Sequence, residues 1–208
     1  MTAPTTTIET VTVVRPLKVL ALLCLIFGVI LQVVAIMTTF WLKSGASRIG
    51  LFEECTSDDP ELMNQGWMTN APKPGECAPS HYERVYVKAV AALLVIGGLL
   101  LVASVILTVL GLNSDNFSRK YLYYRLGMYF ALFAVLLNLV ALLTFPICFY
   151  VEMKNLERNS WEFDWSYGIA WGSTLFAFSA SLLLICDKEH EEIYYKEKVI
   201  YNPPPENA

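Results

Sequence analysis

The sequence predicts an all-α membrane protein built from four transmembrane helices. Hydrophobic residues make up 55% of its 208 residues and charged residues only 16%, whereas charged residues account for about 25% of an average soluble domain. The apolar residues are gathered in four long runs, which is typical of membrane spans and not of one soluble core. The net charge of −4 and the scattered positions of Lys and Arg argue against nucleic acid as a partner.

The first predicted span covers residues 17–42. Within it, the segment from Val19 to Phe40 contains no charged residue, and a helix needs about 20 apolar residues to cross the hydrocarbon core of a bilayer. The run is too long for the apolar core of a cleavable signal peptide, and it ends without a small-residue cleavage site. We therefore expect a retained span behind an N-terminal tail, residues 1–16.

Three further uncharged runs predict spans at residues 89–112, 126–151 and 166–186. Pro146 lies near the end of the third run and indicates a kink or an early end of that helix. The runs contain no Asp, Glu, Lys, Arg or His, and such intramembrane groups usually mark ion paths and proton relays. Their absence counts against a pump or a coupled transporter.

Polar and small residues inside the spans predict how the helices pack. Gln32 and Asn138 are the most polar residues of the apolar runs, and we expect them to form interhelical hydrogen bonds rather than to conduct ions. In the fourth span, Ser173, Ala177 and Ser181 continue a small-residue face that begins with the pair Gly168 and Gly172. Such a pair lets two helices approach closely. Packing inside the bundle is the preferred interpretation of this pair, and dimerisation in the membrane is the alternative.

Four spans place both termini on the same side of the membrane. Arg119, Lys120 and Arg125 crowd the predicted turn, residues 113–125, whereas the connection formed by residues 152–165 carries more acidic than basic residues. Cytosolic connections are enriched in Lys and Arg, so this bias favours a cytosolic location for the turn and for both termini. Residues 152–165 then form extracellular loop two.

Extracellular loop one, residues 43–88, is the largest segment that the spans would hold outside the cell. It contains Cys55 and Cys77, and a disulfide persists in an extracellular setting. A disulfide that closes a loop of this length contributes about 3 kcal/mol to stability in the chain-entropy model. This is a large share of the stability of a loop with few apolar residues. We therefore expect a disulfide that staples a recognition surface; two unrelated thiols are the alternative.

The tail after the last span, residues 187–208, is rich in Glu and Lys and ends in a proline-containing segment. Such a composition cannot bury a core and predicts a disordered cytosolic tail beyond a short helical extension. Tyr194 and Tyr195 follow an acidic stretch that suits a tyrosine kinase; the alternative is a solvated tail with interfacial tyrosines. Cys186 lies where the last span meets the cytosol, which suits reversible palmitoylation and an inert thiol equally.

No catalytic group, metal site or cofactor is predicted, and we expect a non-enzymatic protein. The two histidines, His81 and His190, lie on opposite sides of the membrane and cannot share a site. The acidic residues of loop one lack the spacing of an EF-hand, so a solvated acidic face is the preferred interpretation over a calcium site.

Loop one also carries a resemblance to a known superfamily. Trp41, the segment Gly50-Leu51-Phe52, the two cysteines and Arg84 resemble the W-GLW-C-C signature of the claudin, peripheral myelin protein 22 and epithelial membrane protein superfamily. Phe52 stands where that signature has tryptophan, and the interval between the cysteines is longer than in most claudins. The resemblance implies a claudin-like left-handed four-helix bundle with a small extracellular antiparallel β-sheet from loop one, joined by a strand from loop two. The signature residues would hold this sheet on the bundle.

Residues 15–19, 145–147 and 163–172 are similar to one branch of this superfamily, that of transmembrane protein 47, also called brain cell membrane protein 1. This resemblance implies a plasma-membrane protein of adherens-type cell–cell junctions that supports cell adhesion. Its expected partners are the lipid bilayer, other junction proteins such as the cadherin–catenin complex with cortical actin, and a second copy in the same membrane. A claudin-type paracellular barrier or pore, and an auxiliary subunit that controls the traffic of a channel or receptor, are the alternatives, and the fold does not choose among them.

Overall fold

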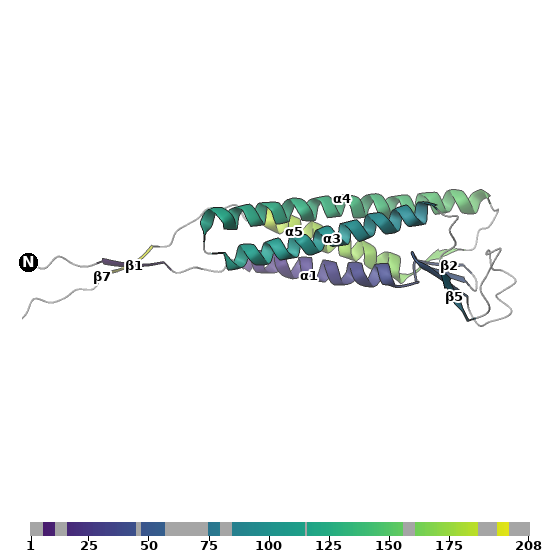
Figure 1. Ribbon diagram of the computed structural model, residues 1–208, viewed down its shortest axis with the longest axis horizontal. Coiled ribbons are helices and arrows are strands. Elements are labelled where there is room, and N and C mark those ends of the chain that lie inside the picture. The colour runs from purple at the N-terminus through teal and green to yellow at the C-terminus, as the bar shows by residue number, and fades with distance from the viewer. Residues whose placement is uncertain are drawn as a thin grey trace, which may run out of the picture.

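The computed structural model contains a bundle of four long helices (Figure 1). They are α1 (Pro16–Met37), α3 (Val85–Asn113), α4 (Phe117–Asn155) and α5 (Trp165–Cys186). The structure describes residues 6–10, 16–44, 47–56, 75–79, 85–114, 116–155, 161–186 and 195–199. Each of the four helices is long and apolar enough to cross a membrane, so the predicted all-α membrane fold is confirmed.

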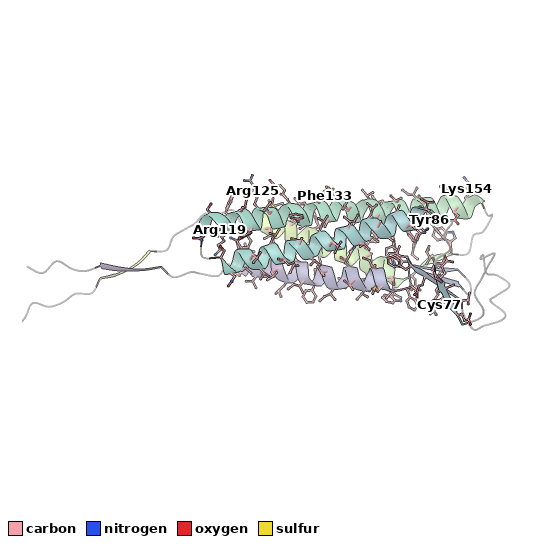
Figure 2. All side chains as sticks on the ribbon, viewed as in Figure 1. Cys77, Tyr86, Arg119, Arg125, Phe133 and Lys154 are labelled. Atoms are coloured by element: carbon pink, nitrogen blue, oxygen red, sulfur yellow. A yellow bond between two sulfur atoms is a disulfide. The ribbon has the colours of Figure 1, made fainter. Side chains whose placement is uncertain are left out.

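Most apolar side chains of these helices point away from the bundle. Only 28–39% of the apolar window of each helix is buried inside the protein, and exposed side chains such as Phe133 cover the outside (Figure 2). A helix that is apolar on all sides is stable when lipid covers its outer face. Many of the buried positions carry small or polar residues, as expected where lipid supplies no hydrophobic drive between helices; those of α1 include Ala21, Gly28, Gln32 and Ala35.

The helix α4 extends beyond the third predicted span at both ends. Its first turns contain Arg119, Lys120 and Arg125, so the predicted turn of residues 113–125 is wrong in extent, and the connection between α3 and α4 is only residues 114–116. Charged residues mark where a helix leaves the hydrocarbon. They do not end it, because long cationic side chains can reach the headgroup region from a continuous helix.

A five-stranded antiparallel sheet caps one end of the bundle, which we call the sheet end (Figure 1). Its strand order is β5-β4-β3-β2-β6. Loop one supplies β2 (Leu42–Ser44), β3 (Ser47–Ile49), β4 (Glu53–Thr56) and β5 (Cys77–Pro79), and loop two supplies β6 (Glu162–Phe163). The implied sheet from loop one, with an added strand from loop two, is therefore confirmed.

The two terminal segments meet at the opposite end, which we call the ribbon end (Figure 1). Strand β1 (Thr6–Thr10) pairs antiparallel with β7 (Tyr195–Val199), and Glu9 lies opposite Lys196 in the register. The expectation of a disordered tail is thus wrong for residues 195–199. The threonines and isoleucine of β1 are β-branched and favour a strand. A two-stranded ribbon alone is marginally stable in water, so it adds little to the stability of the bundle.

The core has a different character at each end of the bundle. At the sheet end it is made by large side chains that include Trp41, Leu94, Leu142 and Phe145. Towards the ribbon end many of the buried positions are alanine, namely Ala131, Ala134, Ala177 and Ala180. Small residues let the helices approach closely at that end, whereas the large rings at the sheet end provide a platform for the sheet.

Candidate functional site

The sheet is fixed to the bundle through Trp41, which lies between the end of α1 and the start of β2. Its side chain is fully buried, and its indole Nε1 donates a hydrogen bond of 2.7 Å to the carbonyl of Ala35. Its backbone N–H donates to the carbonyl of Ile49 in β3, and its own carbonyl accepts from the N–H of Asp164 in loop two. One residue therefore ties the first span to the strands of both loops.

A continuous series of aromatic rings lies beneath the sheet. The ring of Trp41 makes edge contacts with Phe145 of α4 and Tyr167 of α5, at centroid distances of 5.2 and 5.8 Å. The series continues through loop two, where Phe163 stacks on Tyr167 at 4.7 Å and Trp161 makes edge contacts with its neighbours. Each such pair contributes about 0.5–1.5 kcal/mol beyond its buried area, so the rings hold loops and helices in one arrangement.

The segment Gly50-Leu51-Phe52 makes the turn between β3 and β4, and each residue has a separate role. A Cβ atom on Gly50 would lie 2.7 Å from the Cα of Thr39, so only glycine allows the turn to approach the end of α1 this closely. Leu51 is buried in the core below the sheet. Phe52 is 50% exposed and projects outward, so it does not serve as an anchor of the sheet.

The proline in α4 is accommodated by a residue of α5. Pro146 lies inside α4, which continues to Asn155, so an early end of the helix is wrong. Proline has no N–H, and the carbonyl four residues earlier therefore loses its helical hydrogen bond. That carbonyl belongs to Leu142, and it accepts a hydrogen bond of 2.9 Å from the hydroxyl of Tyr167. The neighbouring helix thus satisfies the group that the proline leaves free.

This pairing predicts a double-mutant cycle. Tyr167→Phe is expected to lower the free energy of unfolding by about 1–3 kcal/mol, because the buried carbonyl of Leu142 loses the hydroxyl that donates to it. In a Pro146→Ala background the same change is expected to cost much less, because the substituted alanine restores the N–H within α4. Denaturant titration of the four proteins in bicelles measures both costs, and equal costs in the two backgrounds would contradict the assignment.

A disulfide joins the last two strands that loop one contributes. The Sγ atoms of Cys55 in β4 and Cys77 in β5 are 2.00 Å apart, and the two residues are direct partners in the register. The strand β5 contains three residues and lies at the edge of the sheet. Apart from the disulfide it is supported by its ladder with β4 and by two hydrogen bonds of Thr56 to the carbonyl of Glu76, so the covalent link supplies much of its attachment.

The outward face of the sheet carries a row of polar side chains, which we call the charged row. Successive register partners place Cys77, Cys55, Arg48, Lys43 and Glu162 side by side across all five strands. Arg48, Lys43 and Glu162 are exposed, whereas their neighbours Leu42 and Ile49 are buried on the inward face, as the alternation of a strand requires. Figure 2 shows Cys77 at the sheet end, far from Arg119 and Arg125. The guanidinium of Arg48 lies 4.9 Å from the ring centroid of Phe40, which fixes its position on the face.

The expected interhelical hydrogen bonds of Gln32 and Asn138 are confirmed. The two buried amides pair reciprocally at 3.3 Å, and Gln32 also donates to the carbonyl of Leu94 at 3.1 Å. The hydroxyl of Ser173 lies within hydrogen-bond distance of Gln32 Oε1, at 2.9 Å, and of the Gly28 carbonyl, at 2.8 Å. These contacts join all four helices, so the polar residues specify how the bundle packs.

Of the predicted pair of glycines, Gly168 does not pack inside the bundle. A Cβ atom on Gly168 would have no neighbour within 4 Å, and one on Gly172 would meet only Leu31, at 3.8 Å. The preferred interpretation of packing inside the bundle is therefore wrong for Gly168 among the described residues. Gly97 has that role instead, because a Cβ atom there would overlap the side-chain oxygen of Asn138. Dimerisation through Gly168 stays a prediction.

The remaining predicted site residues are placed as follows. Cys186 is the last residue of α5 and is exposed at the end of the helix. Tyr195 is the first residue of β7, and Tyr194 and Arg84 lie outside the described residues. Within the described part of the chain, no group of three His, Cys, Asp or Glu side chains is placed to hold a metal ion.

Comparison with known proteins shows a match to a protein family and similarity to curated proteins, one of which is from a fish. A profile of the PMP-22/EMP/MP20/Claudin family matches residues 14–184. A protein of Danio rerio named "p53 apoptosis effector related to PMP-22" is 30% identical over 118 residues. That alignment covers 56% of this chain and 60% of the relative, so the chain spans less than two thirds of the length of that protein.

Proposed function

The chain belongs to the PMP-22/EMP/MP20/Claudin family, and we propose that it is a non-enzymatic plasma-membrane protein of cell–cell junctions that uses its sheet as a recognition surface. In this proposal the sheet end is extracellular and both termini are cytosolic. The observation that carries the proposal is the charged row, an exposed polar face on a sheet that is fixed to the bundle by Trp41, the aromatic rings and a disulfide.

The way the sheet is attached supports recognition rather than turnover of a substrate. Binding is strongest when the interacting surface is ordered before the partner arrives, because little conformational entropy is then lost. The charged row meets this condition: its strands are joined by ladders on both sides of β2, and its base is packed on the core. Charges of both signs, Lys43 and Arg48 beside Glu162, give such a face electrostatic specificity for a partner.

The sequence also supports a finer assignment within the family. We assign the chain to the transmembrane protein 47 branch, on the sequence of its fourth span and of residues 145–147. The protein then supports adhesion at adherens-type junctions, acts with the cadherin–catenin complex, and couples to cortical actin through its cytosolic segments. Exposed Cys186 at the ribbon end suits palmitoylation at the cytosolic face, and Tyr194 and Tyr195 are the phosphorylation sites of this assignment.

A mosaic epithelium tests the proposal, with tagged expressing cells beside cells that lack the protein. We expect the tag to be enriched at cell borders over the free membrane. Retention at borders with non-expressing cells would show that another junction component holds the protein in the same membrane. Loss there, with enrichment between two expressing cells, would show that the sheet binds its own kind across the gap. A tag spread evenly over borders and free membrane would contradict a junction function.

A further inference from the structure

A groove lies between the sheet and the outer surface of α3 at the sheet end. It has a volume of about 360 Å³ and is lined by Leu51 and Phe52 of the turn before β4, and by α3 residues that include Lys88, Ala91, Ala92 and Ile96. Ligand sites have volumes of roughly 300–1,000 Å³, so this groove has room for part of an extended molecule. The charged row lies on the strands beside it and contributes no lining residue.

The shape of the groove follows from the sizes of its side chains. Ala91 and Ala92 extend only a methyl group from α3, while Phe52 projects from the turn and is 50% exposed. Ala92 and Ile96 are also exposed, so no other described helix covers this face. Because α3 is one of the four membrane-length helices, the face is in contact with lipid when the protein is in a bilayer.

The charge at the groove selects among lipid molecules. Among the described residues, Lys88 is the one charged residue that lines it, and it lies in the first turn of α3, where a lysine reaches the level of the lipid headgroups. An ammonium at the edge of an apolar groove complements an amphiphile with an anionic phosphate and an acyl chain.

We propose that this groove binds one glycerophospholipid of the leaflet at the sheet end. One acyl chain lies along Ala91, Ala92 and Ile96 beneath Phe52, and the phosphate lies beside the ammonium of Lys88. The bound lipid then supports the turn between β3 and β4 from the membrane side and so helps to set the position of the sheet. This inference rests on the membrane fold and is independent of the proposed junction function.

Native mass spectrometry of the full-length protein, purified in a mild detergent and titrated with phosphatidylcholine, tests the proposal. We expect one phosphatidylcholine to be retained after the others have dissociated. Ala92→Trp fills the groove and is expected to weaken this binding by about tenfold or more. Val109→Trp adds the same side chain at an exposed position near the other end of α3 and is expected to leave the binding unchanged.

A second variant tests the phosphate contact without filling the groove. Lys88→Met is expected to weaken retention of phosphatidylcholine but not of diacylglycerol, which has no phosphate, and Lys88→Arg is expected to preserve both. A mobility shift on reduction shows whether each variant retains the disulfide. If Ala92→Trp lacks the disulfide, the comparison of Lys88→Met with Lys88→Arg tests the proposal instead. Equal retention in Ala92→Trp and Val109→Trp, or equal loss of both lipids in Lys88→Met, would overturn the proposal. If Ala92→Trp lost a dimer of the protein but kept the bound lipid, the proposal would also be overturned, because the groove would then bind a second copy of the chain.

Discussion

Trp41→Ala is expected to detach the sheet from the bundle and to lower the free energy of unfolding by about 3–5 kcal/mol, the usual cost of removing a large buried aromatic side chain. The substitution leaves a cavity between Phe145 and Tyr167 and removes the donor to the Ala35 carbonyl. Denaturant titration in bicelles gives the free energy, and limited proteolysis of loop one reports the loosening of the sheet.

Trp165→Ala is the matched control for this experiment. Trp165 begins α5 and is 46% exposed, and its ring contacts Phe40 at 5.3 Å, so its removal creates no enclosed cavity. We expect a cost well below that of Trp41→Ala and no faster proteolysis of loop one. Equal costs for the two tryptophans would contradict the role of Trp41 as the anchor of the sheet.

Cys55→Ser is expected to free β5 and the end of loop one, to destabilise the loop by about 3 kcal/mol, and to lower delivery to the cell surface. The strand β5 is a short edge strand, so without the disulfide it is held by its ladder with β4 and by the hydrogen bonds of Thr56 to Glu76. Surface biotinylation measures delivery, and a non-reducing gel measures the disulfide. Cys148→Ser, which removes a half-buried free thiol, serves as the control. Normal delivery of Cys55→Ser with an unshifted gel would contradict the account.

The spans and the disulfide were predictable because their signals are local. An uncharged run of about 20 residues has few structures open to it other than a membrane helix, and Cys55 and Cys77 lie in one segment between two such runs. That Gln32 and Asn138 form interhelical hydrogen bonds was also predictable, because each amide needs a partner where water is absent, although their pairing with each other was not predicted. The sequence did not indicate that Ser173 and the Leu94 carbonyl complete this network.

Features that depend on contacts between distant segments were missed or misread. Gly168 and Gly172 have the spacing of a helix-packing pair, but a Cβ atom on Gly168 would meet no described neighbour. The predicted continuation of that face, Ser173 and Ala177, does meet α1, opposite Gly28. Spacing alone gives a small-residue face and not its direction. Pro146 suggested an early helix end because its effect depends on a donor from another helix. Because Pro146 has no N–H, the sequence indicates that the carbonyl of Leu142 needs another donor, but no local pattern identifies Tyr167 as that donor.

The register of the sheet could not be predicted from the sequence either. A shift by one residue would move Lys43 and Arg48 to the core and Leu42 and Ile49 to solvent, and it is the burial of these apolar residues against the aromatic rings that fixes the observed pairing. The charged row is a consequence of that register. The ribbon of β1 and β7 likewise joins segments from the two ends of the chain, which no local pattern relates.

The most direct test of the central claim reverses the charge of the row. We would measure the enrichment of Lys43→Glu/Arg48→Glu at borders between expressing epithelial cells, relative to the free membrane. The control is Lys154→Glu, which reverses an exposed charge at the end of α4, at the same end of the molecule but outside the sheet (Figure 2). The account predicts that the double variant reaches the surface with its disulfide intact but loses its border enrichment, while Lys154→Glu keeps it. Full enrichment of both variants would contradict the charged row as the recognition surface, and a changed ion permeability of the cell sheet with enrichment intact would favour a claudin-type barrier instead.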